Sequence, residues 1–284
     1  DLMHTNENYA HGLGKLKDEN YFRCDISEYR QLEYVIDYVK PDFVYNLAAE
    51  FGRWNSLYFY EQVWKTNCIG LEHILRLQNK YNFKLIHASS SEVYGDTEEL
   101  MIENLLEKMP IEQLNSYAMT KRCNEMQVKN FRALYDNQVV MCRYFNTYGP
   151  GERYHPFRSV NCLFSYNLLH NKPVTIYKGH TRTSTYLDDA VRTTANIIEN
   201  FKNGEVYNIA SDRLHTIEYL VELIAKETGK ENLIKYVEKN EILTTKHKIV
   251  DATKSKNDLK HENTITLEKG VKNTIKWMKK FYNL

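Results

Sequence analysis

Three short, continuously apolar runs alternate with helical patterns in the first half of this chain, and this alternation constrains the fold more than any other feature. The apolar runs cover residues 43–49, 84–88 and 139–145, and the helical patterns cover residues 32–39, 63–75 and 116–135. Strands that are separated by helices of this length pair in parallel. Uninterrupted apolar strands also indicate a sheet that is covered on both faces. The sequence therefore predicts an α/β fold with a doubly wound parallel sheet.

The second half of the chain has a less regular pattern. It predicts a helix marked by Val191, Ala195 and Ile198, a strand at 206–209, and helices around 216–224 and 267–278. These elements favour a smaller α+β lobe over the carboxyl edge of the sheet, where open α/β sheets bind ligands. Pro (5) and Gly (11) are scarce, and no linker rich in them separates the halves. We therefore expect one domain over residues 1–146, with 183–210 returning to it, and a second lobe formed mainly by 147–284.

The composition argues against several classes of function. Lys plus Arg number 38 and Asp plus Glu number 37, so the net charge of +1 gives no sign of a nucleic-acid surface. The five cysteines are scattered without a C-x-x-C pair, which is typical of reduced thiols and not of a disulfide framework or zinc site. No apolar run approaches the ~18 residues of a membrane span. We expect a cytoplasmic protein without a metal site and without nucleic-acid or membrane partners.

Three polar segments follow or adjoin the predicted strands. Ser90-Ser91-Glu92 follows one strand, Tyr117 and Lys121 lie four residues apart at the start of a helix, and Arg143-Tyr144-Phe145-Asn146 ends the next strand. Residues four apart share one helix face, and a nearby ammonium lowers the pKa of a phenol from its usual value of about 10. We therefore expect Tyr117 to exchange a proton with a substrate hydroxyl that Ser90 also contacts. A solvated Tyr–Lys pair on the helix surface is the alternative.

These segments, in this order, resemble those of the extended short-chain dehydrogenase/reductase family of nucleotide-sugar epimerases, dehydratases and decarboxylases. Asn46-Leu47-Ala48-Ala49 and Thr181–Asp189 extend the resemblance over nearly the whole chain. It implies a Rossmann-like sheet and NAD or NADP as the cofactor. The cofactor-binding residues that it implies are Asp25, Ile26, Leu47, Ala48, Ala49, Asn67, Tyr117, Lys121 and Tyr144. The substrate-binding residues that it implies are Glu50, Ser91, Asn146 and Arg182, of which the arginine would pair with a diphosphate.

The resemblance is incomplete at the beginning of the chain. The family opens with a strand, a G-x-x-G-x-x-G turn that holds the cofactor pyrophosphate, and a helix. Gly12 and Gly14 do not fit this motif, because no apolar strand precedes them. We therefore expect that the N-terminal βαβ unit is missing from this chain and that some tens of residues precede Asp1.

Glu92 distinguishes among the reactions of the family. The resemblance implies a glutamate here in 4,6-dehydratases, often after an aspartate, and a small or hydroxyl residue in 4-epimerases. The nucleotide-sugar decarboxylases of the family also show a Ser-Glu pair. Because Ser91 replaces that aspartate, the pattern is closest to the GDP-mannose type, and Glu92 would perform both proton transfers. The alternatives are a capping carboxylate for Glu92 and, for Arg182, a surface ion pair with Asp188 or Asp189.

These expectations combine into a hypothesis of an NAD(P)-dependent nucleotide-sugar 4,6-dehydratase. The catalytic residues would be Ser90, Glu92, Tyr117 and Lys121. A nucleotide-diphosphate sugar, with a GDP-sugar favoured, would be the substrate, and the segment 50–55 would border its pocket or form a packed loop. An epimerase, a C4 oxidoreductase or a decarboxylase of the same family is the alternative, and a non-catalytic NAD-binding protein is the rival from another class. The resemblance also implies a homodimer.

Overall fold

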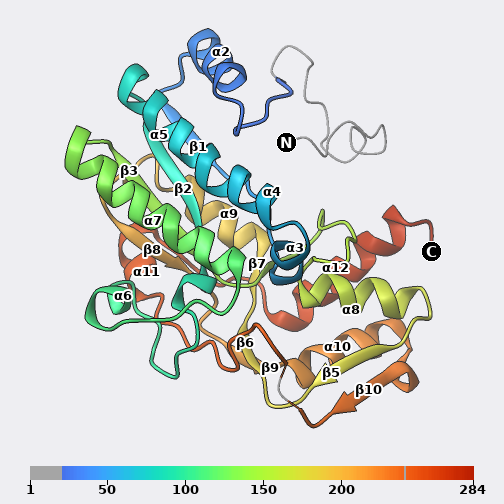
Figure 1. Ribbon diagram of the computed structural model, residues 1–284. Coiled ribbons are helices and arrows are strands. Elements are labelled where there is room, and N and C mark those ends of the chain that lie inside the picture. The colour runs from blue at the N-terminus through green and yellow to red at the C-terminus, as the bar shows by residue number, and fades with distance from the viewer. Residues whose placement is uncertain (1–20, 240) are drawn as a thin grey trace.

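The computed structural model describes residues 21–239 and 241–284, and its centre is a four-stranded parallel sheet (Figure 1). The strand order is β1-β2-β3-β8, with β1 Phe43–Asn46, β2 Lys84–Ser90, β3 Val139–Tyr144 and β8 Val206–Ile209. Ala88 pairs with Cys142, and Met141 pairs with Val206. The predicted α/β fold with a parallel sheet is therefore confirmed. Gly12 and Gly14 lie outside the described residues.

Helices cover both faces of the sheet. One face carries α2 (Tyr29–Val39), α5 (Gly70–Tyr81) and α7 (Ser116–Tyr135), and the other carries α9 (Leu187–Ala195) and α11 (Thr253–Leu259). Successive strand residues point to opposite faces, so Leu85 packs in the first layer and its neighbour Ile86 packs in the second. Both layers are apolar, which explains the uninterrupted apolar strands. None of the helices in the described ranges has the length and apolar character needed to cross a membrane.

The connection from β1 to β2 is a helix that changes type along its length. It consists of α3 (Arg53–Tyr58), α4 (Tyr60–Trp64), the π-helical segment η3 (Lys65–Ile69), and α5. The helix predicted over 63–75 corresponds to the last three. Single π-helical turns often occur at functional sites. Here η3 carries the buried Asn67, whose amide donates a hydrogen bond of 2.9 Å to the Thr120 hydroxyl on α7.

A second lobe has its own apolar core. Its helices are α8 (Val160–Leu169), α10 (Ile217–Thr228) and α12 (Leu267–Phe281), and they pack with the parallel pair β5 (Val174–Tyr177) and β10 (Ile234–Val237). The remaining short elements are β4 (Thr147–Tyr148) with β7 (Thr185–Tyr186), β6 (Thr181–Thr183) with β9 (Leu214–Thr216), and η4 (Ser91–Tyr94), α6 (Leu105–Lys108) and η5 (Glu231–Leu233). Helices and two-stranded pairs together make the expected α+β lobe (Figure 1).

The apolar pattern misplaced the buried face of α9. The helix ends at Ala195, and Val191 and Ile198 are 56% and 45% exposed. Asp189 is buried instead, and its carboxylate accepts hydrogen bonds from the Thr264 hydroxyl at 2.6 Å and the Thr264 backbone N–H at 3.0 Å. A buried carboxylate with several donors thus sets the orientation of this helix, which an apolar stripe cannot reveal.

A buried ion pair joins α7 to β3. The guanidinium of Arg143 donates two parallel hydrogen bonds of 2.8 Å to the carboxylate of Glu125, and the two side chains are 3% and 0% exposed. The remaining bonding capacity is used, because Ser89 donates to the same carboxylate at 2.7 Å and Arg143 also donates to the Tyr94 hydroxyl at 2.8 Å. This network holds α7, the helix that carries Tyr117 and Lys121, against the sheet.

Arg143→Met should destabilise the fold by about 3–5 kcal/mol, because it leaves the buried Glu125 carboxylate without its cation. Arg122→Met is the matched control, since Arg122 lies 3.6 Å from the same carboxylate but is partly exposed. Its loss should change the free energy of unfolding by less than about 1 kcal/mol. Denaturant unfolding of both variants measures the difference, and equal effects would contradict this account.

Candidate functional site

A cavity of about 490 Å³ lies between the carboxyl edge of the sheet and the second lobe. Parallel strands end on the same edge, so segments far apart in the sequence meet there. The predicted site residues that line the cavity are Ser90, Ser91, Glu92, Tyr117, Tyr144, Asn146 and Arg182. The structure therefore brings the residues expected for proton transfer and for substrate binding to one place.

Tyr117 and Lys121 lie one turn apart at the start of α7. The Asn115 side chain caps this helix by accepting a hydrogen bond of 2.8 Å from the N–H of Ala118. Lys121 Nζ lies 5.9 Å from the centre of the Tyr117 ring and donates to the carbonyl of Ala88 at 2.8 Å. Because Lys121 is only 3% exposed, the alternative of a solvated surface pair is wrong.

The pKa of Tyr117 differs from the expectation. Burial raises this pKa to about 12, the Ser90 hydroxyl lowers it in part, and the Glu92 carboxylate raises it. Lys121 is not among the groups that shift it, and burial lowers the pKa of this ammonium to about 8. The predicted lowering of the Tyr117 pKa by Lys121 is therefore wrong for this structure, in which desolvation has the largest effect on this pKa and Ser90 is the group that lowers it.

Glu92 forms an ion pair across the cavity wall. Its carboxylate is paired with the ammonium of Lys248 and accepts a hydrogen bond of 3.3 Å from the Asn115 amide. The cap of η4 is Ser90, whose hydroxyl accepts from the N–H of Glu92 at 3.2 Å. Glu92 is therefore not a capping carboxylate. Burial is the largest influence and raises its pKa, but Lys248, Arg182 and the Asn115 amide together outweigh burial and leave this pKa below its ordinary value.

Arg182 is buried against backbone and not paired with an acid. It donates to the Thr181 carbonyl at 2.7 Å and to the Thr244 hydroxyl at 3.1 Å. Asp189 pairs with Arg192 instead, at 2.6 Å. The expected alternative of a surface ion pair with Asp188 or Asp189 is therefore not formed. The guanidinium faces the cavity without a carboxylate partner among the described residues.

The segment 50–55 borders the cavity. Phe51, Gly52, Arg53 and Trp54 line it. Arg53 is ion-paired with Glu241 and also donates to the Ile242 carbonyl at 3.2 Å. The charge of Arg53 is therefore already neutralised. Its side chain connects the segment 50–55 to the second lobe.

The other predicted cofactor residues do not line this cavity. These are Asp25, Ile26, Leu47, Ala48, Ala49, Asn67 and Lys121, together with Glu50 from the substrate set. The side-chain amide of Asn67 forms two hydrogen bonds of 2.9 Å with the backbone of Glu50. It accepts one from the Glu50 N–H and donates the other to the Glu50 carbonyl. Asp25 accepts from the backbone and hydroxyl of Ser27. Asn67 thus fixes the loop after β1 in place.

The described residues fit part of a nicotinamide-nucleotide site. At the carboxyl end of β1, Leu47 is 63% exposed and is followed by two alanines, so this edge is open. Ala48 and Ile26 line a smaller, chiefly apolar cavity beside it. At the end of β3, the buried Oδ1 of Asn146 has no hydrogen-bond partner in the described part of the chain. The open apolar edge suits a flat heterocycle, and Asn146 lines the larger cavity, where the substrate is expected.

Two residues of the cavity were missed by sequence reasoning. Lys248 and His180 line it, and both are at most 3% exposed. Neither ring nitrogen of His180 has a partner within residues 21–239 and 241–284. Both lie in polar stretches without a motif, so nothing in the pattern marked them. The same ranges hold no cluster of three or more His, Cys, Asp or Glu placed to bind a metal ion.

Comparison with known proteins places these observations in context. Residues 2–210 match the family described as the NAD dependent epimerase/dehydratase family. The chain is 27% identical to the dTDP-glucose 4,6-dehydratase of Salmonella typhimurium, covering 95% of this chain and 82% of that protein. It is 29% identical to the UDP-N-acetyl-alpha-D-glucosaminuronate decarboxylase of Bacillus cytotoxicus, covering 85% and 78%.

A solved structure shares the fold over nearly the whole chain. The UDP-glucuronic acid 4-epimerase of Bacillus cereus, in complex with UDP-glucuronic acid and NAD, superimposes with a TM-score of 0.84 at 26% identity. The match covers 94% of this chain and 84% of that one. By name, these relatives share nucleotide-sugar substrates and differ in the reaction.

The depressed pKa of Lys121 predicts a pH-dependent contribution to stability. Its pKa is about 8 in the folded chain and about 10.4 when unfolded. Between these values the unfolded chain binds more protons, so stability rises with pH; below pH 8 folding must bury the ammonium. Wild type should therefore gain stability relative to Lys121→Met as the pH rises from 8 to about 10.4. Denaturant unfolding at several pH values measures this gain, and a constant difference would contradict it.

Proposed function

The chain belongs to the NAD-dependent epimerase/dehydratase family, and from this premise we propose that it is a nucleotide-sugar 4,6-dehydratase. Such an enzyme oxidises the sugar at C4, eliminates water across C5 and C6, returns the hydride to C6, and releases a 4-keto-6-deoxy sugar with no net use of the cofactor. The observation that carries the proposal is the Glu92 carboxylate, which lines the same cavity as Tyr117 and Ser90.

Residues at the carboxyl edge of the sheet, in the loops beside it and on η3 and α7 would hold the cofactor. Asp25 and Ile26 would contact its adenosine end, and Leu47, Ala48, Ala49, Asn67 and Tyr144 would form the wall beside it, with Tyr117 and Lys121 at the nicotinamide end. When bound, oxidised nicotinamide would supply a hydride acceptor and a positive charge that favours the phenolate form of Tyr117. NAD is the cofactor in the family's description.

Tyr117 would take the proton of the C4 hydroxyl. Ser90 lies in the same cavity and would orient that hydroxyl by a hydrogen bond. Lys121, beside the Tyr117 ring, would stabilise the negative charge as it forms. The C4 ketone then makes the proton at C5 acidic, and the Glu92 carboxylate would remove it. The role would favour a pKa raised by burial, whereas the pKa of Glu92 lies below its ordinary value; the carboxylate is therefore ionised but is a weaker base than a free glutamate.

The charges near Glu92 favour a neutral C6 hydroxymethyl group over a carboxylate at C6. A sugar carboxylate would lie beside the Glu92 carboxylate, and two like charges at close range repel strongly in a partly buried cavity. Lys248, the cation nearest to Glu92, is already paired with it. This supports a hexose dehydratase over an epimerase or decarboxylase of uronic acids.

The nucleotide would extend from the sugar toward the second lobe. Arg182 would pair with the diphosphate, since its guanidinium faces the cavity without an acidic partner among the described residues. Asn146 would offer its unpartnered oxygen to the same ligand. We retain the GDP-sugar preference as a proposal, and UDP- and dTDP-sugars belong in the same test because the relatives are named for them.

Glu92→Gln should abolish formation of the 4-keto-6-deoxy product, by about 10²- to 10⁴-fold, because the amide cannot accept the C5 proton. Oxidation at C4 should persist and is followed by reduced-cofactor absorbance during a single turnover. Glu241→Gln is the control, since Glu241 lines the same cavity but is paired with Arg53. Unchanged dehydration in Glu92→Gln would refute the role of Glu92. Solvent deuterium at C5 without loss of oxygen would favour an epimerase.

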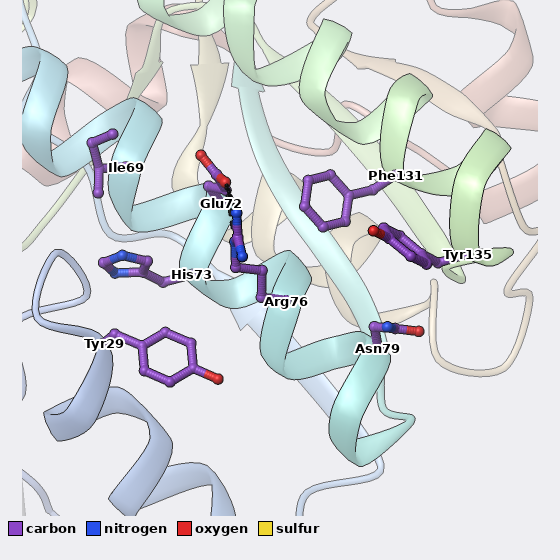
Figure 2. A pocket seen from close by; sticks show the side chains of 8 residues that line it. All are labelled: Tyr29, Ile69, Glu72, His73, Arg76, Asn79, Phe131 and Tyr135. Carbon is purple, nitrogen blue, oxygen red and sulfur yellow. Dashed lines mark hydrogen bonds and ion pairs between the residues drawn. The ribbon is translucent and has the colours of Figure 1, made fainter.

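We also propose that two copies associate through α4, η3, α5 and α7. These helices lie side by side on one sheet face, and their outer surface exposes apolar side chains: Tyr60 53%, Ile69 44%, Met119 45% and Met126 58%. Figure 2 shows a groove on the outer side of α5 and α7, where Phe131 and Tyr135 face Arg76 and Glu72. A matching helix pair from a second copy would bury this surface in a four-helix bundle.

Met119→Glu combined with Met126→Glu should convert a dimer to a monomer, because both charges would be buried in the bundle. Val191→Glu is the control, since Val191 is equally exposed but lies on the opposite face of the sheet. Sedimentation velocity measures the masses. A wild type that is monomeric, or a double variant that stays dimeric, would contradict this interface.

A further inference from the structure

Lys248 is held in place by backbone hydrogen bonds on both sides. Its own N–H donates to the Thr181 carbonyl at 3.3 Å, and the next residue, Ile249, accepts from the N–H of Met101 at 2.8 Å. The segment that carries Lys248 is thus fixed between the second lobe and the sheet. The backbone of Lys248 cannot move far from the cavity wall without breaking these contacts.

The ammonium of Lys248 reaches the turn after β2. It is paired with the Glu92 carboxylate and contacts the Ser91 hydroxyl at 3.1 Å, and the side chain is 3% exposed. Ser90, Glu92, Tyr117 and Lys248 all line the cavity. Lys248 therefore contacts Ser91, which replaces the aspartate that often precedes this glutamate in 4,6-dehydratases.

The ion pair of Lys248 and Glu92 is largely buried, with side chains 3% and 22% exposed. Removing both charges from water costs free energy that their attraction only partly returns, so pairs of this kind often serve function. Here one member is a carboxylate in its basic form and the other an ammonium in its acidic form. Burial lowers the pKa of Lys248, which makes it a stronger acid than a free lysine, although Glu92 opposes this.

We infer, on the basis of the proposed dehydration, that Lys248 is the acid that protonates the departing C6 oxygen. Glu92 takes the C5 proton, the C5–H electron pair forms the C5–C6 double bond, and the C6–O bond breaks as Lys248 gives its proton to that oxygen. Water leaves, Glu92 is now protonated and Lys248 is neutral. Glu92 returns a proton to C5 when C6 is reduced, and Lys248 recovers the proton that Tyr117 took from the C4 hydroxyl. Glu92 then performs one kind of proton transfer, not two.

The test compares two leaving groups at C6 in the full-length protein with its cofactor. One substrate is the nucleotide hexose with a C6 hydroxyl, and the other is its 6-fluoro analogue, since fluoride can leave without a proton. Lys248→Arg keeps the positive charge beside Glu92 but cannot give up a proton. It should slow loss of water by about 100-fold or more and loss of fluoride by less than about threefold.

Further variants separate the possible outcomes. Lys248→Met should show the same selective loss, Glu92→Gln should lose both eliminations, and the exposed neighbour Lys246→Met should lose neither. If Lys248→Arg and Lys248→Met slow both eliminations equally, Lys248 only positions Glu92 and the acid role is wrong. If they slow neither, Lys248 has no part in elimination. If the wild type eliminates neither water nor fluoride after C4 oxidation, the proposed function is itself wrong, and the acid role falls with it.

Discussion

The buried pair of Glu125 and Arg143 fixes the edge of the sheet on which the cavity depends. Arg143 lies near the end of β3, and Glu125 lies one turn beyond Lys121 on α7. Ser89, next to Ser90 on β2, donates to the same carboxylate. One ion pair thus sets the distance between the helix that carries Tyr117 and the strand end that carries Ser90. Removing a single partner would leave a charge in a layer with little water.

The features of the fold that depend on local periodicity and on parallel strand topology were predicted correctly from the sequence. The apolar runs identified β1, β2 and β3, and Ser90, Glu92 and Tyr117, which were expected at one site, line one cavity. Predictions that depended on the environment of a side chain were less successful. The pKa of Tyr117 is raised by burial, and burial cannot be read from a four-residue spacing.

The position of Lys248 in the cavity wall could not be predicted from the sequence. It lies 156 residues from Glu92 in a polar stretch, and its side chain is nonetheless buried in the cavity wall. Only the packing of the second lobe against the sheet brings the two together. The buried face of α9 was also not predicted, because it is determined by hydrogen bonds to Asp189. In both cases a charged group with tertiary partners overrides the apolar pattern.

The π-helical turn η3 has a geometric consequence for the two helices that it joins. Each residue of an α-helix advances the chain by about 100°, and a π-helical turn accommodates one residue more than an α-helical turn. Val63 before the turn and Leu71 after it are both fully buried. The eight residues from Val63 to Leu71 would rotate a regular α-helix by about 800°, which leaves the two side chains about 80° apart. The wider π-helical turn reduces this angle and brings both side chains toward one face. Replacing the turn by regular α-helix of the same length would therefore turn one of the two away from the core.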